Sequence, residues 1–125
     1  MKIFSVEEAN SLLPSVRPLV HRIQLAHTDI LEERTEATRA SESAERGGGG
    51  VNNGTTYAAN LMTMTETVAE LEELGIQLKD FSRGLIDFPS LRDGRVVLLC
   101  WQLGEGDQLE WWHDMDAGFA GRTPL

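Results

Sequence analysis

The 125-residue chain contains one cysteine, Cys100, and has no long run of apolar residues. A single cysteine excludes an intramolecular disulfide and a zinc site built from several cysteines, and it is typical of a reducing compartment. The longest apolar segment, 96–101, is far shorter than the roughly 20 residues of a membrane-spanning helix. Residues 1–5 contain no apolar core of a signal peptide. We therefore expect a cytoplasmic protein without a membrane span.

Basic side chains are also scarce. The chain has 11 Lys and Arg against 20 Asp and Glu, a net charge of −9, and its sequence shows no Lys/Arg cluster. Proteins that bind nucleic acid or anionic membranes need a basic surface, so neither partner is expected. The composition, 41% hydrophobic and 25% charged, is that of an ordinary globular protein, and the length suits one domain over residues 1–125.

Residues 5–80 have the periodicity of two long helices. Ser5 and Glu8 form a capping box, which predicts a helix start. Apolar residues then recur with spacings that alternate between four and three, first along Ala9, Leu13, Val16, Val20 and Ile23, with Ile30 one heptad further on and the polar His27 at the seam position between them, and later along Tyr57, Leu61, Met64, Val68 and Leu71. This heptad spacing predicts a coiled-coil-like pair of antiparallel helices. The glycine-rich residues 47–54 between them predict a flexible tip.

After Lys79 the pattern changes to short apolar runs with a period of two. It predicts strands at 84–88, 95–103 and 108–113, a loop at 89–94 that ends in the turn pair Asp93-Gly94, and a turn at 104–107. The expected fold is α+β: a long helical hairpin followed by a small three-stranded antiparallel sheet in a β-rich part at 84–125. A turn at 104–107 places Leu99 opposite Trp112 on one face, and it places Asp87, Cys100 and His113 on the other.

The β-rich part also holds the residues that could carry chemistry. His113 with Asp116 or Asp87 offers the nitrogen and oxygen ligands of a divalent metal. However, Asp87 lies two strands from His113, roughly 10 Å by ordinary strand spacing. The alternative is a hydrogen-bonded, half-buried His113 with aspartates that cap turns. Cys100, inside the central strand, is expected to be a buried, unreactive thiol.

A second group of residues is suited to ligand binding. Arg122 could clamp an anionic group, and Glu105 and Asp87 could lie near a cation. Trp101 and Trp112 could form a stacking wall, although tryptophans on a sheet more often belong to a core or an oligomer interface. No Ser-His-Asp, Cys-His or paired-carboxylate arrangement is evident, so no catalytic residue is assigned.

The chain also resembles a known family. The resemblance covers nearly the whole sequence and is carried by 4–10, 12–14, 70–75, 79–80, 84–89, 93–95, 99–101, 104–105, 112–113 and 117–122. In these segments the chain is similar to the bacterial family of uncharacterised proteins known as domain of unknown function 2203 (DUF2203). The resemblance implies no activity, and therefore no role for any residue.

Two functional hypotheses follow. One is a non-catalytic interaction or scaffold protein, in which the helices form a homo-oligomer and the Trp-rich end recruits a protein partner. Apolar residues that lie off the helical seam favour a second copy that covers them: Leu12, Leu19, Leu31, Leu74 and Ile76. The other is a small metal-dependent or ligand-binding enzyme, with its site at the Trp/His/Asp-rich end of the chain.

Overall fold

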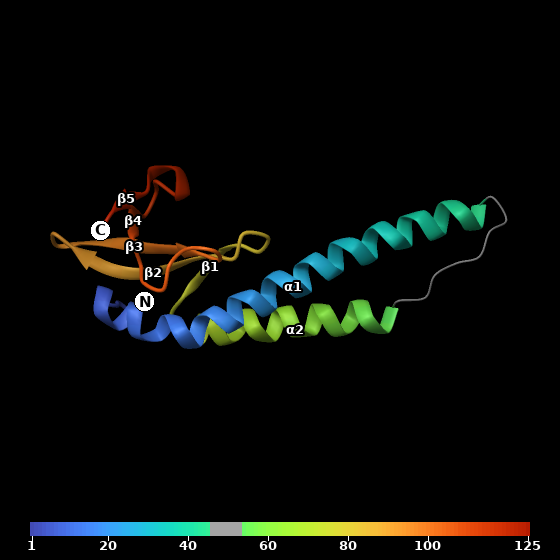
Figure 1. Cartoon of the computed structure of the whole chain (residues 1–125), viewed down its shortest axis with the longest axis horizontal. Helices are drawn as coiled ribbons and strands as arrows, with labels where there is room; N and C mark the ends of the chain where they lie inside the picture. The colour runs from blue at the N-terminus through green and yellow to red at the C-terminus, as the bar shows by residue number, and fades with distance from the viewer. Residues whose placement is uncertain (46–53) are drawn as a thin grey trace.

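A computed structural model describes residues 1–45 and 54–125 of the chain. It contains two helices and a five-stranded antiparallel sheet (Figure 1). The elements are α1 (Val6–Glu45), α2 (Gly54–Glu73), β1 (Gln77–Asp80), β2 (Leu85–Arg92), β3 (Arg95–Gln102), β4 (Trp111–Asp114), the short 3-10 helix η1 (Phe119–Gly121) and β5 (Thr123–Pro124). The predicted flexible tip at 47–54 lies outside the described residues, apart from Gly54.

The helical hairpin forms as its local signals predict. At the start of α1, the backbone N–H of Glu8 donates to Ser5 Oγ at 3.0 Å, which is one half of the capping box. The two helices run antiparallel, and Arg34 Nε on α1 donates to the Tyr57 hydroxyl near the start of α2 at 3.3 Å. The apolar seam residues from Ala9 to Ile30 that the heptad spacing selects are buried, and so is Leu71 on α2.

The second helix is shorter than predicted, because Gly75 ends it. Gly75 has φ +90°, its N–H donates to Glu72 O at 2.9 Å, and the N–H of Ile76 donates to Leu71 O at 3.0 Å. These two hydrogen bonds form a Schellman cap, and the flanking residues Leu71 and Ile76 are both buried in the hydrophobic core. The hairpin therefore stops before residue 77, and the expected helix end at 77–80 is instead the edge strand β1.

The sheet has five strands rather than the predicted three, in the order β1-β2-β3-β4-β5. The loop predicted at 89–94 is wrong for residues 89–92, because β2 continues through Pro89 to Arg92. Pro89 is tolerated there because β1 pairs with β2 only as far as Asp87, so this side of β2 requires no ladder hydrogen bond from residue 89. The last predicted strand begins at Trp111 rather than at residue 108.

The turn chemistry and strand register are as predicted. Asp93 and Gly94, with φ of 52° and 77°, form the two-residue turn between β2 and β3, as a type I′ hairpin requires. Leu99 lies opposite Trp112. Every side chain of β3 is therefore on the face that the sequence predicts.

The core lies between the helices and one face of the sheet (Figure 1). Ile86, Phe88, Leu99 and Trp101 supply the sheet side of this core. Four of the five off-seam residues for which a second copy was expected contact the chain's own core: Leu12, Leu19 and Leu74 are partly buried against it, and Ile76 is buried within it. Only Leu31 remains exposed.

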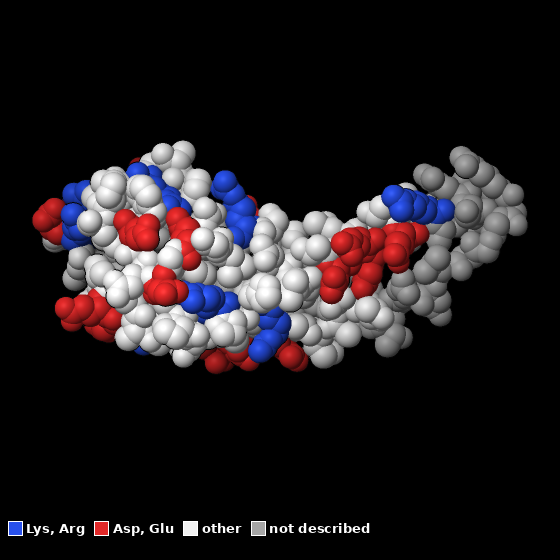
Figure 2. Space-filling view, in the orientation of Figure 1, with Lys and Arg blue, Asp and Glu red and all other residues white. Residues whose placement is uncertain are grey.

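The hairpin projects beyond the sheet as an arm (Figure 1). In the view of Figure 2, acidic side chains gather over this arm, whereas acidic and basic side chains are mixed over the sheet end. In the described ranges, neither helix has the length and apolar composition needed to cross a membrane.

Candidate metal centre

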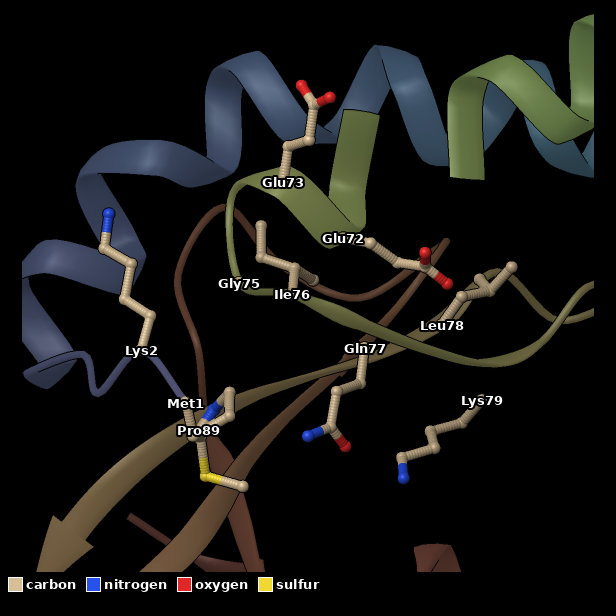
Figure 3. Close-up of a pocket in the computed structure, with 10 residues that line it drawn as sticks. All are labelled: Met1, Lys2, Glu72, Glu73, Gly75, Ile76, Gln77, Leu78, Lys79 and Pro89. Carbon is tan, nitrogen blue, oxygen red and sulfur yellow. The ribbon is translucent and has the colours of Figure 1, made fainter. Parts of the chain in front are cut away.

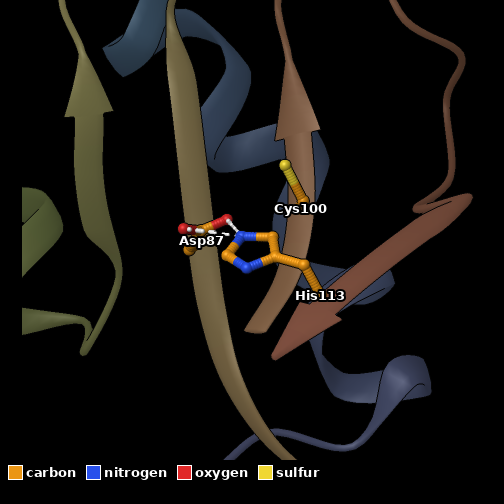
Figure 4. A group of neighbouring side chains, drawn as sticks. All are labelled: Asp87, Cys100 and His113. Carbon is orange, nitrogen blue, oxygen red and sulfur yellow. Dashed lines mark hydrogen bonds and ion pairs between the residues drawn. The ribbon is translucent and has the colours of Figure 1, made fainter. Parts of the chain in front are cut away.

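The sheet face away from the helices carries three polar side chains on adjacent strands. Asp87 lies on β2, Cys100 on β3 and His113 on β4, and Asp87 is directly opposite Cys100 (Figure 4). Their exposed fractions are 1%, 0% and 3%. Three buried polar groups on a sheet face are costly unless they satisfy one another.

His113 and Asp87 are in direct contact. Nε2 of the ring lies 3.1 Å from Oδ1 and 3.2 Å from Oδ2 of Asp87, so the imidazole spans β3 to reach the carboxylate. The expected separation of roughly 10 Å is therefore wrong for the side chains. Strand spacing measures backbones, whereas both side chains here lean toward the strand between them.

The other ring nitrogen defines the tautomer. Nδ1 of His113 lies 2.7 Å from the carbonyl oxygen of Asp114, and because a carbonyl oxygen only accepts, Nδ1 carries the hydrogen. Nε2 then presents either a lone pair or an additional proton toward Asp87. Since a lone pair facing a carboxylate is repulsive, either a hydrogen carried by one of the two groups or a metal ion must lie between these atoms.

The third member of the group is Cys100. One ligand atom from each of Asp87, Cys100 and His113 lies within 4.8 Å of the others. The pKa of the Cys100 thiol is raised to about 12, chiefly by burial and to a smaller extent by the neighbouring carboxylate of Asp87. The thiol is thus protonated and a poor nucleophile, as the sequence predicts, unless a metal ion displaces its proton.

Burial also controls Asp87. It raises the pKa of this carboxyl above the ordinary value, and the opposing effect of His113 is smaller. Asp87 accordingly has a strong requirement for a cationic or hydrogen-bonding partner when it is ionised.

Arg122 lies beside Cys100. Its Nη1 lies 4.0 Å from Cys100 Sγ, and its Nη2 lies 2.5 Å from Oε2 of Glu105. The guanidinium also sits between the rings of Trp111 and Phe119, 4.7 and 4.6 Å from their centres. The Arg122 guanidinium, which was expected to bind an anionic ligand, is therefore paired with Glu105.

The remaining predicted residues lie elsewhere. Asp116 is exposed in the turn after β4, apart from His113. Trp101 is buried in the core on the helix side of the sheet, and Trp112 packs against that core with Arg92 over its ring at 4.7 Å. The structure thus brings together Asp87 with His113, and Glu105 with Arg122, but it places Trp101 and Trp112 on the helix side of the sheet, away from the Asp87–His113 pair.

Cys100 is the member that sequence reasoning did not include among the ligands. The predicted register already placed it on the face of Asp87 and His113, so the signal was available. It was interpreted as an inert thiol because a lone cysteine matches no spacing motif.

The three side chains form a donor set suited to zinc. Imidazole, thiolate and carboxylate are all zinc ligands, and bonds of about 2.0–2.1 Å in a tetrahedron separate nitrogen and oxygen ligands by about 3.3 Å, close to the distance seen here. The bond from His113 Nδ1–H to a backbone carbonyl is the outer-shell contact that metal-binding histidines usually make. Among the residues whose side chains the structure describes, no other group of three His, Cys, Asp or Glu side chains converges in this way.

Comparisons with known proteins identify a family. The model of the family described as "Uncharacterized conserved protein (DUF2203)" matches residues 2–125. No curated protein and no solved structure matched the chain.

Proposed function

We propose that this chain, which belongs to the DUF2203 family of uncharacterised conserved proteins, is a metalloprotein that binds a transition-metal ion such as Zn²⁺. The ligands are Asp87, Cys100 and His113. The observation that carries the proposal is the convergence of three buried donor side chains, in which Nε2 of His113 faces Asp87 while Nδ1 is committed to the Asp114 carbonyl, so that a metal ion can take the place of the hydrogen between them.

The chemistry of the donors selects the class of metal. Calcium and magnesium prefer oxygen ligands, whereas a thiol and an imidazole favour zinc and related transition metals. The charges also balance, because one carboxylate and one thiolate neutralise a divalent ion, which lowers the cost of holding it in a buried site.

Three protein ligands leave one position of a tetrahedral ion for water or another small ligand. This number is typical of zinc sites that act on substrates, whereas structural zinc sites usually have four protein ligands. The centre therefore favours the ligand-binding alternative over the scaffold hypothesis.

The test is metal stoichiometry in matched histidine variants. We expect purified wild-type protein to bind one Zn²⁺ per chain by elemental analysis, His113→Ala to lose it, and His21→Ala to retain it, because His21 is exposed on α1. With Co²⁺ as a substitute, the wild type should show a thiolate-to-cobalt charge-transfer absorption that Cys100→Ser lacks. A wild type that binds no metal, or variants that bind equally, would overturn the proposal.

We further propose that the helical arm pairs with a second copy of the chain. The specific observation in favour is that Leu25, Leu31 and Met62 on the arm are exposed by 52%, 46% and 62%. Apolar surface on a protruding pair of helices is commonly buried by association into a bundle.

A further inference from the structure

A cleft lies beside the edge strand β1, between the end of α2 and the sheet. Its volume is about 630 Å³, within the range of pockets that hold small molecules. The walls include Glu72 and Glu73 at the end of α2, Gln77 and Lys79 on β1, and Pro89 on β2 (Figure 3).

The cleft is adjacent to the metal centre. Gln77 lies directly opposite Asp87 in the pairing of β1 with β2, a position in which Cβ atoms are about 4.5–5.5 Å apart. Lys79 is two residues along from Gln77, and Pro89 is two residues along from Asp87. Because side chains alternate along a strand, Gln77, Asp87 and Pro89 belong to the sheet face that carries the centre. The register of β1 with β2 shifts between Leu78 and Asp80, so Lys79 is placed by Figure 3, where it points the same way as Gln77.

The two ends of the cleft carry opposite charges. The Gln77 amide and the Lys79 ammonium point the same way from β1, away from the helices (Figure 3). In the part of the chain that the structure describes, neither group has a hydrogen-bond or ion-pair partner, although the Lys79 charge acts on Asp87. At the other end, Glu72 and Glu73 join the negative end of the α2 dipole.

Lys2 also lines the cleft but is directed elsewhere. Its Nζ lies over the ring of Phe4, 5.2 Å from the centre, and it points away from Lys79 in Figure 3. Among the described residues that line the cleft, Lys79 is therefore the side-chain cation without a partner, and the N-terminal ammonium of Met1 is a second positive charge in the lining. Lys79 lies beside an amide donor, one strand away from Asp87.

We propose that this cleft binds a small molecule through an oxyanion, a carboxylate or a phosphate, held by Lys79 and Gln77. An ammonium and an amide are complementary to an oxyanion, and charge-assisted hydrogen bonds are roughly twice as strong as neutral ones.

The experiment is a titration of the ¹⁵N-labelled protein, followed by NMR, with acetate and with inorganic phosphate. In wild type we expect saturable shifts of the Gln77 side-chain amide and of the Lys79 backbone signal. Lys79→Gln should weaken binding at least about tenfold, as expected for loss of a charged hydrogen bond. Lys2→Gln, the matched control within the same cleft, should bind as the wild type does. The preferred probe, acetate or phosphate, identifies the oxyanion class.

Shifts that do not saturate, or equal binding by Lys79→Gln, would overturn the cleft as an oxyanion site.

Discussion

At the scale of single residues, the important distinction is between polar pairs that are buried and pairs that are exposed. Asp87 and His113 are both almost fully buried, and each satisfies the other. Arg95 and Asp114 make an ion pair of similar length, 2.9 Å, but both side chains are about half exposed. Asp87 and Asp114 therefore both pair with a basic side chain, but the loss of the buried pair is expected to cost more stability than the loss of the exposed one.

We predict that Asp87→Ala, measured in metal-free protein, lowers the free energy of unfolding by about 3 kcal/mol, because it leaves a buried imidazole without its partner. Asp114→Ala should cost less than about 1 kcal/mol, as is usual for exposed pairs, and its backbone carbonyl still accepts from His113. Urea unfolding at pH 7 in the presence of a chelator gives both values. Equal losses would show that the Asp87–His113 contact contributes no special stability.

At the scale of elements, two glycines with positive φ serve different purposes. Gly94 has φ +77° and open space around the position of a Cβ. Gly84 has φ +61°, and a Cβ there would lie 2.5 Å from Leu103 Cδ1 and 2.9 Å from Val20 Cγ1. Gly84 thus allows the segment between β1 and β2 to approach both α1 and the end of β3.

We predict that Gly94→Ala costs about 1–2 kcal/mol, the price of a left-handed conformation for a residue with a Cβ. Gly84→Ala should cost more, on the order of 3 kcal/mol, because steric overlap with the core adds to the backbone strain. Thermal and urea unfolding of the two variants make the comparison. A smaller loss for Gly84→Ala would mean that Leu103 moves aside without cost.

At the scale of the whole molecule, the arm combines exposed apolar residues with a strong negative charge. Asp29, Glu32, Glu33 and Glu36 lie on this half of α1, and Figure 2 shows acidic side chains gathered there. Two such arms repel each other unless salt screens the charge, so association through the arm should strengthen as ionic strength rises.

We predict that sedimentation equilibrium at micromolar concentration and moderate salt finds a species of twice the 13.9 kDa chain mass. Leu31→Glu should shift it to the monomer, because it adds charge to the proposed contact. Leu91→Glu should not, since Leu91 is equally exposed, at 61%, but lies on β2 near the turn to β3. A wild-type monomer, or the same response from both variants, contradicts pairing through the arm.

The sequence by itself determined the features that depend on neighbours in the chain. The capping box at Ser5, the heptad seam from Ala9 to Ile30 and the type I′ turn at Asp93-Gly94 are all short-range signals, and the structure contains each of them. The opposition of Leu99 and Trp112 follows from the turn before β4, because a period of two transmits the register along the whole strand.

Tertiary structure decided the rest. Gly75 is compatible with a helix interior or with a cap, and the burial of Ile76 in a core shared with Leu71 selects the cap, which converts 77–80 into β1. The predicted register placed Asp87, Cys100 and His113 on one face, but whether they touch depends on side-chain direction across three strands and on the burial that forces polar groups to pair. Contacts between residues 13 to 26 positions apart depend on packing in three dimensions, which no local pattern encodes.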